Sequence, residues 1–153
     1  MLSDHQKMYK ELTVVLSEYY LNYLLYNKNA QRFNDYHLTT QQDAFLFFMK
    51  DNPRITANEI AKKFAISKSA VSQVLSKLEA QNFIKREANP NKHREFFIRL
   101  AEKGLDYQAL SEEADKEFME KHFADIDLEQ LENVLRTMKK VNVSISPPQH
   151  IGR

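Results

Sequence analysis

Residues 56–82 read TANEIAKKFAISKSAVSQVLSKLEAQN and contain two helix starts in quick succession. Thr56 is expected to cap a short helix over residues 57–64, because threonine favours the position just before a helix. Ser67 is expected to cap a second, longer helix that reaches about Asn82. Only the short turn Ala65-Ile66-Ser67 separates the two helices. This arrangement is typical of a helix-turn-helix unit.

The second of these helices has two chemically different faces. One face is apolar and is expected to lie inward; it consists of Ala70, Val71, Val74, Leu75 and Leu78. The opposite face carries small, polar or basic side chains, namely Lys68, Ser69, Ser72, Gln73, Ser76 and Lys77. A longer second helix with a polar, cationic outer face is what a recognition helix for DNA requires.

Two short runs with strand propensity follow, over residues 83–86 and 96–99. The segment between them, Ala88 to Arg94, is rich in turn-forming and basic residues and includes Lys92, His93 and Arg94. A hairpin with a basic tip directly after the second helix predicts the wing of a winged helix-turn-helix.

The sequence on either side of this core predicts further helices. In the N-terminal part, apolar or aromatic residues recur three or four apart, as in a heptad seam on one long helix: Leu2, Tyr9, Leu12, Leu16, Tyr19, Tyr23 and Tyr26, with His5 completing the series. A helix of that length needs a partner to cover its apolar seam, so another chain is expected to pack on it.

A second helix should begin where Thr39 or Thr40 caps it and end near Asn52, before Pro53. Another should open at Ala101-Glu102-Lys103-Gly104, and Asp127 should cap the last one. The domain organisation predicted is a winged helix-turn-helix core over residues 38–104, dimerisation helices over 1–35 and 105–145, and a tail over 146–153. The fold class is all-α with a small β-hairpin wing.

The composition excludes several classes of protein. Cysteine is absent, so there is no disulfide framework, thiolate nucleophile or cysteine zinc site. The only two glycines are Gly104 and Gly152, which excludes a glycine-rich phosphate loop. No apolar run is long enough to span a membrane and no secretory signal is visible, so a cytoplasmic protein is expected.

Charge is unevenly distributed although the net charge is only +1. Residues 51–104 carry eleven Lys or Arg against six Asp or Glu, which gives +5, whereas residues 105–153 carry six against ten, which gives −4. The positive charge coincides with the predicted helix-turn-helix and wing, where a polyanion would bind.

The ordered set of these segments resembles the MarR family of bacterial transcriptional regulators. The resemblance rests on Leu38-Thr39, Ile55 to Ala61, Ser69 to Ser72, Leu78 to Ile84, Arg94 and Leu100 to Gly104. The chain departs from the family pattern in four places. Lys92 replaces an acidic residue two before the wing arginine, Ala101 replaces threonine, and Gln73 and Asn82 replace an arginine and a glycine that many members carry.

The resemblance implies a homodimer that binds a pseudo-palindromic double-stranded DNA operator, most often as a repressor relieved by a small molecule. The predicted DNA contacts are Lys68, Ser69, Ser72, Gln73, Lys77, Lys92, His93 and Arg94. Gln73 is the best base-reading candidate because its amide can pair with adenine through two hydrogen bonds. Arg94 is expected to enter the minor groove.

Relatives in the family that bind aromatic acids suggest a ligand cleft, which Tyr19, Tyr23, Tyr26 and Tyr36 could line. Packing in the core and the dimer interface explains the same tyrosines more simply. The five histidines never fall three to five residues apart, so neither a metal site nor a cofactor is predicted, and no catalytic constellation is visible. The alternative function is a winged-helix module that binds a partner protein rather than DNA.

Overall fold

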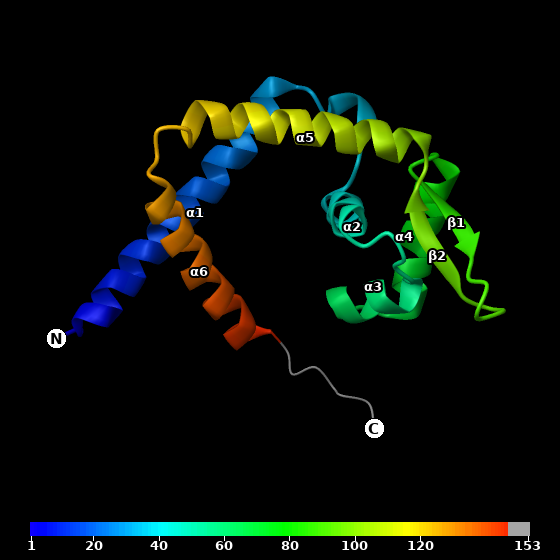
Figure 1. The fold of residues 1–153 in the computed structure, drawn as a ribbon, viewed down its shortest axis with the longest axis horizontal. Helices are drawn as coiled ribbons and strands as arrows, with labels where there is room; N and C mark the ends of the chain where they lie inside the picture. The colour runs from blue at the N-terminus through cyan, green and yellow to red at the C-terminus, as the bar shows by residue number, and fades with distance from the viewer. Residues whose placement is uncertain (147–153) are drawn as a thin grey trace. The chain divides into compact units, whose positions relative to one another are not determined.

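The structure is a computed structural model that describes residues 1–146, apart from the side chains of Asn29 and Ala30 (Figure 1). The elements in chain order are α1 (Asp4–Ala30), the 3-10 helix η1 (Asn34–Tyr36), α2 (Thr40–Lys50), α3 (Ala57–Phe64), α4 (Lys68–Ala80), β1 (Ile84–Ala88), β2 (Phe96–Leu100), α5 (Glu102–His122) and α6 (Leu128–Ile145). The chain divides into two compact units, Met1–Ser111 and Glu112–Arg153. The fold is mostly helical with a two-stranded antiparallel wing, as the sequence predicted.

Local capping determines where three of the helices begin. Ser3, Thr39 and Thr56 each form a capping box, in which the hydroxyl accepts from the backbone N–H three residues on and that residue's side chain accepts from the cap N–H. At this cap, Glu59 N donates to Thr56 Oγ1 at 3.3 Å, and Thr56 N donates to Glu59 Oε2 at 2.8 Å. The cap of α2 is therefore Thr39 and not Thr40.

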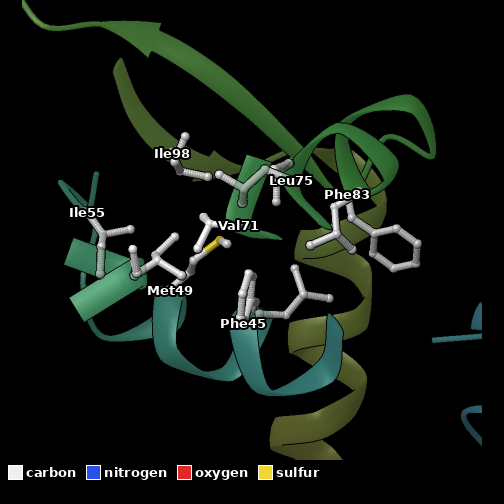
Figure 2. Close-up of a cluster of buried hydrophobic side chains, with 12 residues drawn as sticks. Phe45, Met49, Ile55, Val71, Leu75, Phe83 and Ile98 are labelled. Carbon is white, nitrogen blue, oxygen red and sulfur yellow. The ribbon is translucent and has the colours of Figure 1, made fainter. Parts of the chain in front are cut away.

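The core of the winged domain lies between α2, α3, α4 and the wing. Figure 2 shows Phe45 and Met49 of α2 pointing toward Val71 and Leu75 of α4, with Ile55, Phe83 and Ile98 around them. The completely or almost completely buried side chains in this cluster are Phe45, Ile60, Val71, Leu75, Leu78, Phe83, Ile84 and Ile98. One face of α4 is thus used entirely for packing, which leaves the other face free.

The wing is an antiparallel pair in which Ile84 lies opposite Leu100 and Ala88 lies opposite Phe96. A third segment extends this sheet, because Thr56 forms an isolated antiparallel bridge with Phe97 and the Ile98 N–H donates to Ile55 O at 2.8 Å. This bridge, which was not predicted, attaches the wing to the start of α3.

Helix α4 ends at Ala80, two residues before the predicted end at Asn82. Asn82 adopts a left-handed conformation with φ 61°, and the Phe83 N–H donates back to Leu78 O at 2.9 Å. Such a turn ends a helix and favours glycine, but asparagine tolerates it better than other side chains do. Asn82 can therefore stand where many MarR proteins have glycine.

Gly104, in the first turn of α5, approaches the turn that follows α4 very closely. A Cβ atom at Gly104 would lie 2.1 Å from the carbonyl oxygen of Phe83. That carbonyl accepts from Ala101 N at 2.9 Å, and the neighbouring carbonyl of Asn82 accepts from Lys103 N at 3.1 Å. The first turn of α5 is therefore seated directly on residues 82–83, and only glycine permits this distance.

Tyr107 joins α5 to α2. Its hydroxyl donates to Asp43 Oδ1 at 2.5 Å, and its ring makes edge contacts with Phe33, Tyr36 and Phe83 at centroid distances of 5.5, 5.0 and 6.4 Å. Burial, reinforced by the Asp43 carboxylate, raises the pKa of the Tyr107 phenol above its ordinary value. The phenol is therefore retained as a donor throughout the neutral range.

Helix α1 is 27 residues long, about 40 Å at the usual rise. Leu2, which was expected on this helix, lies before it, because Ser3 is the cap. Many large apolar side chains of α1 are exposed: Met8, Tyr9, Leu12, Val14, Val15, Leu16, Tyr19, Tyr20, Leu21, Leu24 and Leu25.

Helix α6, which Asp127 caps as predicted, also exposes apolar side chains, namely Leu128, Val134, Leu135, Val141, Val143 and Ile145. None of the helices within residues 1–146 is long and apolar enough to cross a membrane. The predicted tail begins at Ser146, which terminates α6; its remaining residues, 147–153, lie outside the described part of the chain.

Gly104→Ala should destabilise the protein, although alanine favours a helix by about 1 kcal/mol over glycine. The new methyl group would overlap a backbone carbonyl, and we expect a net loss of about 2 kcal/mol or more in the free energy of unfolding. Ala109→Gly, on the exposed side of the same helix, should cost only about 1 kcal/mol. Urea denaturation measures both; a stabilised Gly104→Ala protein would contradict the close approach.

Tyr107→Phe should lower the free energy of unfolding by about 1–2 kcal/mol, because it removes a hydrogen bond to a carboxylate and keeps the ring contacts. Tyr9→Phe is the matched control, since Tyr9 is exposed on α1 and should change stability by less than about 0.5 kcal/mol. Equal denaturation midpoints for the two variants would show that the Tyr107–Asp43 bond contributes nothing.

Candidate nucleic-acid interface

The outer face of α4 is polar and solvent-exposed. The five α4 residues predicted to contact DNA, Lys68, Ser69, Ser72, Gln73 and Lys77, are all exposed, as is Ser76. Their side chains form no hydrogen bond or ion pair with any residue in the described part of the chain. The opposite face is anchored by three buried residues, Val71, Leu75 and Leu78. The helix therefore presents unpaired donors and acceptors on a surface that the core holds in place.

The turn before α4 fixes how its N-terminus is presented. Ser67 Oγ accepts from Ala70 N at 3.1 Å, and the Ile66 N–H donates to Ala61 O at 3.1 Å across the turn. Ala65 adopts the left-handed conformation, with φ 51°. These contacts close the turn between α3 and α4 over very few residues.

A recess of about 460 Å³ lies where α3 meets the start of α4. Its lining adds two exposed polar residues, Asn58 and Lys62, to the predicted surface beside Ser67 and Lys68. Sequence reasoning did not single them out, although both lie on the outer side of α3, opposite the buried Ile60. The signal in the sequence that could have found them is their polar character on the side of the helix opposite Ile60, within a cationic segment.

The cations of this domain fall into two groups. Arg86 forms an ion pair with Glu79 at 3.1 Å. Arg99 Nε lies 2.6 Å from Glu87 Oε2, as an ion pair rather than an aligned hydrogen bond. Salt bridges thus pair the two strand arginines, Arg86 and Arg99, whereas Lys68 and Lys77 on α4 form none within residues 1–146.

The loop between β1 and β2 carries the three predicted wing residues, Lys92, His93 and Arg94, all of them exposed. Lys92 lies 3.6 Å from Glu95 in an ion pair. The side chains of His93 and Arg94 have no partner in the described residues. Arg94 therefore remains available to an external anion, whereas the charge of Lys92 is partly compensated.

The tyrosines predicted for a ligand cleft fall into different surroundings. Tyr19 and Tyr23 stack on α1 with ring centroids 6.2 Å apart, and Tyr26 is half-buried on the same helix. Tyr36, of η1, packs against Phe83 at 6.1 Å and against Tyr107, and this packing accounts for it without a ligand. No three His, Asp or Glu side chains within the described part of the chain gather as metal ligands would.

The chain is similar to known regulators in sequence and in fold. Residues 38–95 match the model of the MarR family. Over 141 residues the chain is 23% identical to the HTH-type transcriptional regulator BilQ of Clostridioides difficile, an alignment that covers 90% of this chain and 93% of that protein.

Two solved structures share the fold. Streptococcus pneumoniae FabT in complex with DNA has a TM-score of 0.73 at 17% identity, covering 88% of this chain and 95% of FabT. A mutant of S. aureus MepR bound to an oligodeoxyribonucleotide has a TM-score of 0.57 at 21% identity, covering 90% of this chain and 98% of MepR. The segment that matches the family model, residues 38–95, covers α2, α3, α4, β1 and the loop of the wing. Residues 38–95 are thus a winged helix-turn-helix domain that matches the MarR family of DNA-binding transcriptional regulators.

Proposed function

We propose that the protein is a homodimeric, sequence-specific repressor in which α4 of each protomer enters the major groove and each wing contacts the adjacent minor groove. The observation that carries this proposal is the outer face of α4, which is exposed, polar, unpaired within the described residues and backed by a buried apolar face. A protein helix of this kind fits the major groove and can read base edges there.

The residues have different proposed roles. Gln73 reads a base edge, because its side-chain amide offers a donor and an acceptor together. Ser69 and Ser72 contact base edges or phosphates, and Lys68 and Lys77 neutralise phosphates. Arg94 enters the minor groove, where a narrow A·T-rich segment attracts a guanidinium.

The dimer is proposed from the apolar surfaces of α1 and α6. A monomer rarely exposes so many large apolar side chains on one helix, and a second copy of the chain would cover them. Two α4 helices about 34 Å apart would then reach successive major grooves, so the operator should be a pseudo-palindrome.

We further propose that a small effector molecule regulates DNA binding. A ligand near Tyr19, Tyr23 and Tyr26 of α1 would relieve repression by favouring a spacing of the two winged domains that does not fit the operator. Such a ligand must bind the two spacings with different affinities, and the required coupling is modest.

The competing function is a module that binds a partner protein. The unpaired cations of α4 and the wing favour DNA, since their contact with phosphates releases counterions and makes binding steeply dependent on salt. The structures of the relatives FabT and MepR, solved with DNA and an oligodeoxyribonucleotide, support the same choice.

Gln73→Ala should reduce the preference for the native duplex by roughly 5- to 100-fold and leave binding to a scrambled duplex unchanged, because only base reading is lost. Arg94→Ala should weaken native binding roughly 10-fold and reduce the salt slope by about 1. Fluorescence anisotropy over a salt series measures both. Lys116→Ala on α5 is the control and should bind as the wild type does; unchanged affinity in both test variants would refute the assignment.

Leu16→Glu should dissociate the dimer, because it places a charge on the exposed apolar surface of α1. Sedimentation should give about twice the 18.1 kDa chain mass for the wild type and about that mass for the variant. Specific DNA affinity should fall by at least roughly 10-fold, since each half-site then binds alone. Leu16→Met, which conserves volume, should remain dimeric; a dimeric Leu16→Glu protein would argue against this surface.

A further inference from the structure

The loop of the wing is closed by two residues that the predicted DNA contacts do not include. Asn89, directly after β1, and Glu95, directly before β2, face each other across the base of the loop. The Asn89 N–H donates to Glu95 O at 3.1 Å, and Asn89 Nδ2 donates to Glu95 Oε1 at 2.9 Å. Both residues are half-buried, so these bonds are partly shielded from water.

Asn89 also fixes the path of the loop. Its side-chain Oδ1 accepts from Asn91 N at 3.0 Å, and its carbonyl accepts from Lys92 N at 3.2 Å. With the two bonds to Glu95, every hydrogen-bonding group of Asn89 is used. An asparagine that bonds to its own backbone two residues on is a known way of setting a turn.

Glu95 uses both oxygens of its carboxylate. Oε1 accepts from Asn89, and Oε2 lies 3.6 Å from Lys92 Nζ. The Glu95 N–H in turn donates to Lys92 O at 3.2 Å. The backbone is therefore bonded on both sides of the dipeptide His93-Arg94, whose own side chains have no partner in the described residues.

We propose that Asn89 and Glu95 are positioning residues that hold Arg94 in its DNA-contacting orientation, and so determine specificity at the minor groove. In this chain Lys92 stands where the MarR pattern has an acidic residue, and the bonds made by Asn89 and Glu95 fix the loop. This inference rests on the proposed function, since it assigns the pair a role only through contact of Arg94 with DNA.

The physical reason is preorganisation. A loop whose backbone is already fixed loses less conformational freedom when its arginine enters a groove, so more of the contact energy appears as affinity. Loss of the Asn89–Glu95 bonds should therefore weaken binding to an A·T-rich flank, where the contact of Arg94 with the minor groove is strongest. Binding to a scrambled duplex should change much less.

The test is a double-mutant cycle with Asn89→Ala and Arg94→Ala, measured by fluorescence anisotropy on the native duplex. Asn89→Ala should weaken binding roughly 5-fold and Arg94→Ala roughly 10-fold, whereas the double variant should bind within about 2-fold of Arg94→Ala. This non-additivity is the signature of a residue that acts through Arg94. Effects that multiply, or an Asn89→Ala protein that binds as the wild type does, would overturn the inference.

Two further variants separate positioning from a general loss of structure. Glu95→Gln keeps an oxygen that can accept from Asn89, so it should bind within roughly 3-fold of the wild type, whereas Glu95→Ala should resemble Asn89→Ala. Asn91→Ala is the matched control, because Asn91 takes part only through its backbone N–H, and it should be unaffected. Thermal melting and amide NMR spectra verify that each variant is folded.

Failure of the proposed function gives a different result. If the wild type shows no preference for the native duplex over the scrambled one, the proposed function fails and this inference fails with it. If the wild type shows the preference and Arg94→Ala weakens it, but Asn89→Ala and Glu95→Ala do not, the inference alone is wrong.

Discussion

The winged domain depends on the close approach of Gly104 to the carbonyl of Phe83. Phe83 ends the turn after α4, buries its ring completely in the core and precedes the first strand of the wing. The same residue offers its carbonyl to Ala101 N, so α5 starts on it. Any side chain larger than the hydrogen of Gly104 would separate α5 from this point. One small residue thus allows α4, the wing and α5 to meet.

This junction has a consequence for the interface. Because Phe83 and Ile84 belong to the same buried cluster as Val71 and Leu75 of α4, α4 and the wing share one core. The bridge between Thr56 and Phe97 adds a second attachment, from the start of α3 to β2. A common core lets α4 and the wing act together, which the proposed contact with two grooves at once would require.

Structural features that depend on residues close together in the sequence were predicted correctly. The caps at Thr56 and Ser67 and the bounds of α3 follow from short-range patterns, and the structure confirms them. The two faces of α4 follow from helical periodicity in the same way. The choice between Thr39 and Thr40 was left open because both residues suit a cap, and the Gln42 side chain decides for Thr39.

Contacts between distant residues were beyond this kind of prediction. The role of Gly104 depends on a carbonyl that lies 21 residues earlier in the chain, and no local pattern points to it. The Asn89–Glu95 pair was missed for a related reason: its residues are adjacent only once the loop has folded. The family pattern directed attention to Lys92, and not to the two residues on either side of the loop that bond to each other.

The central claim is that the cationic face of α4, together with the wing, reads a specific duplex. The most direct measurement is fluorescence anisotropy of the wild-type protein with duplex from the region upstream of its own gene, beside a scrambled duplex, over a salt series. We predict tight binding that prefers the native duplex and weakens steeply as salt rises. Equal, weak binding to both duplexes, or none, would contradict the account and favour a partner protein as the target.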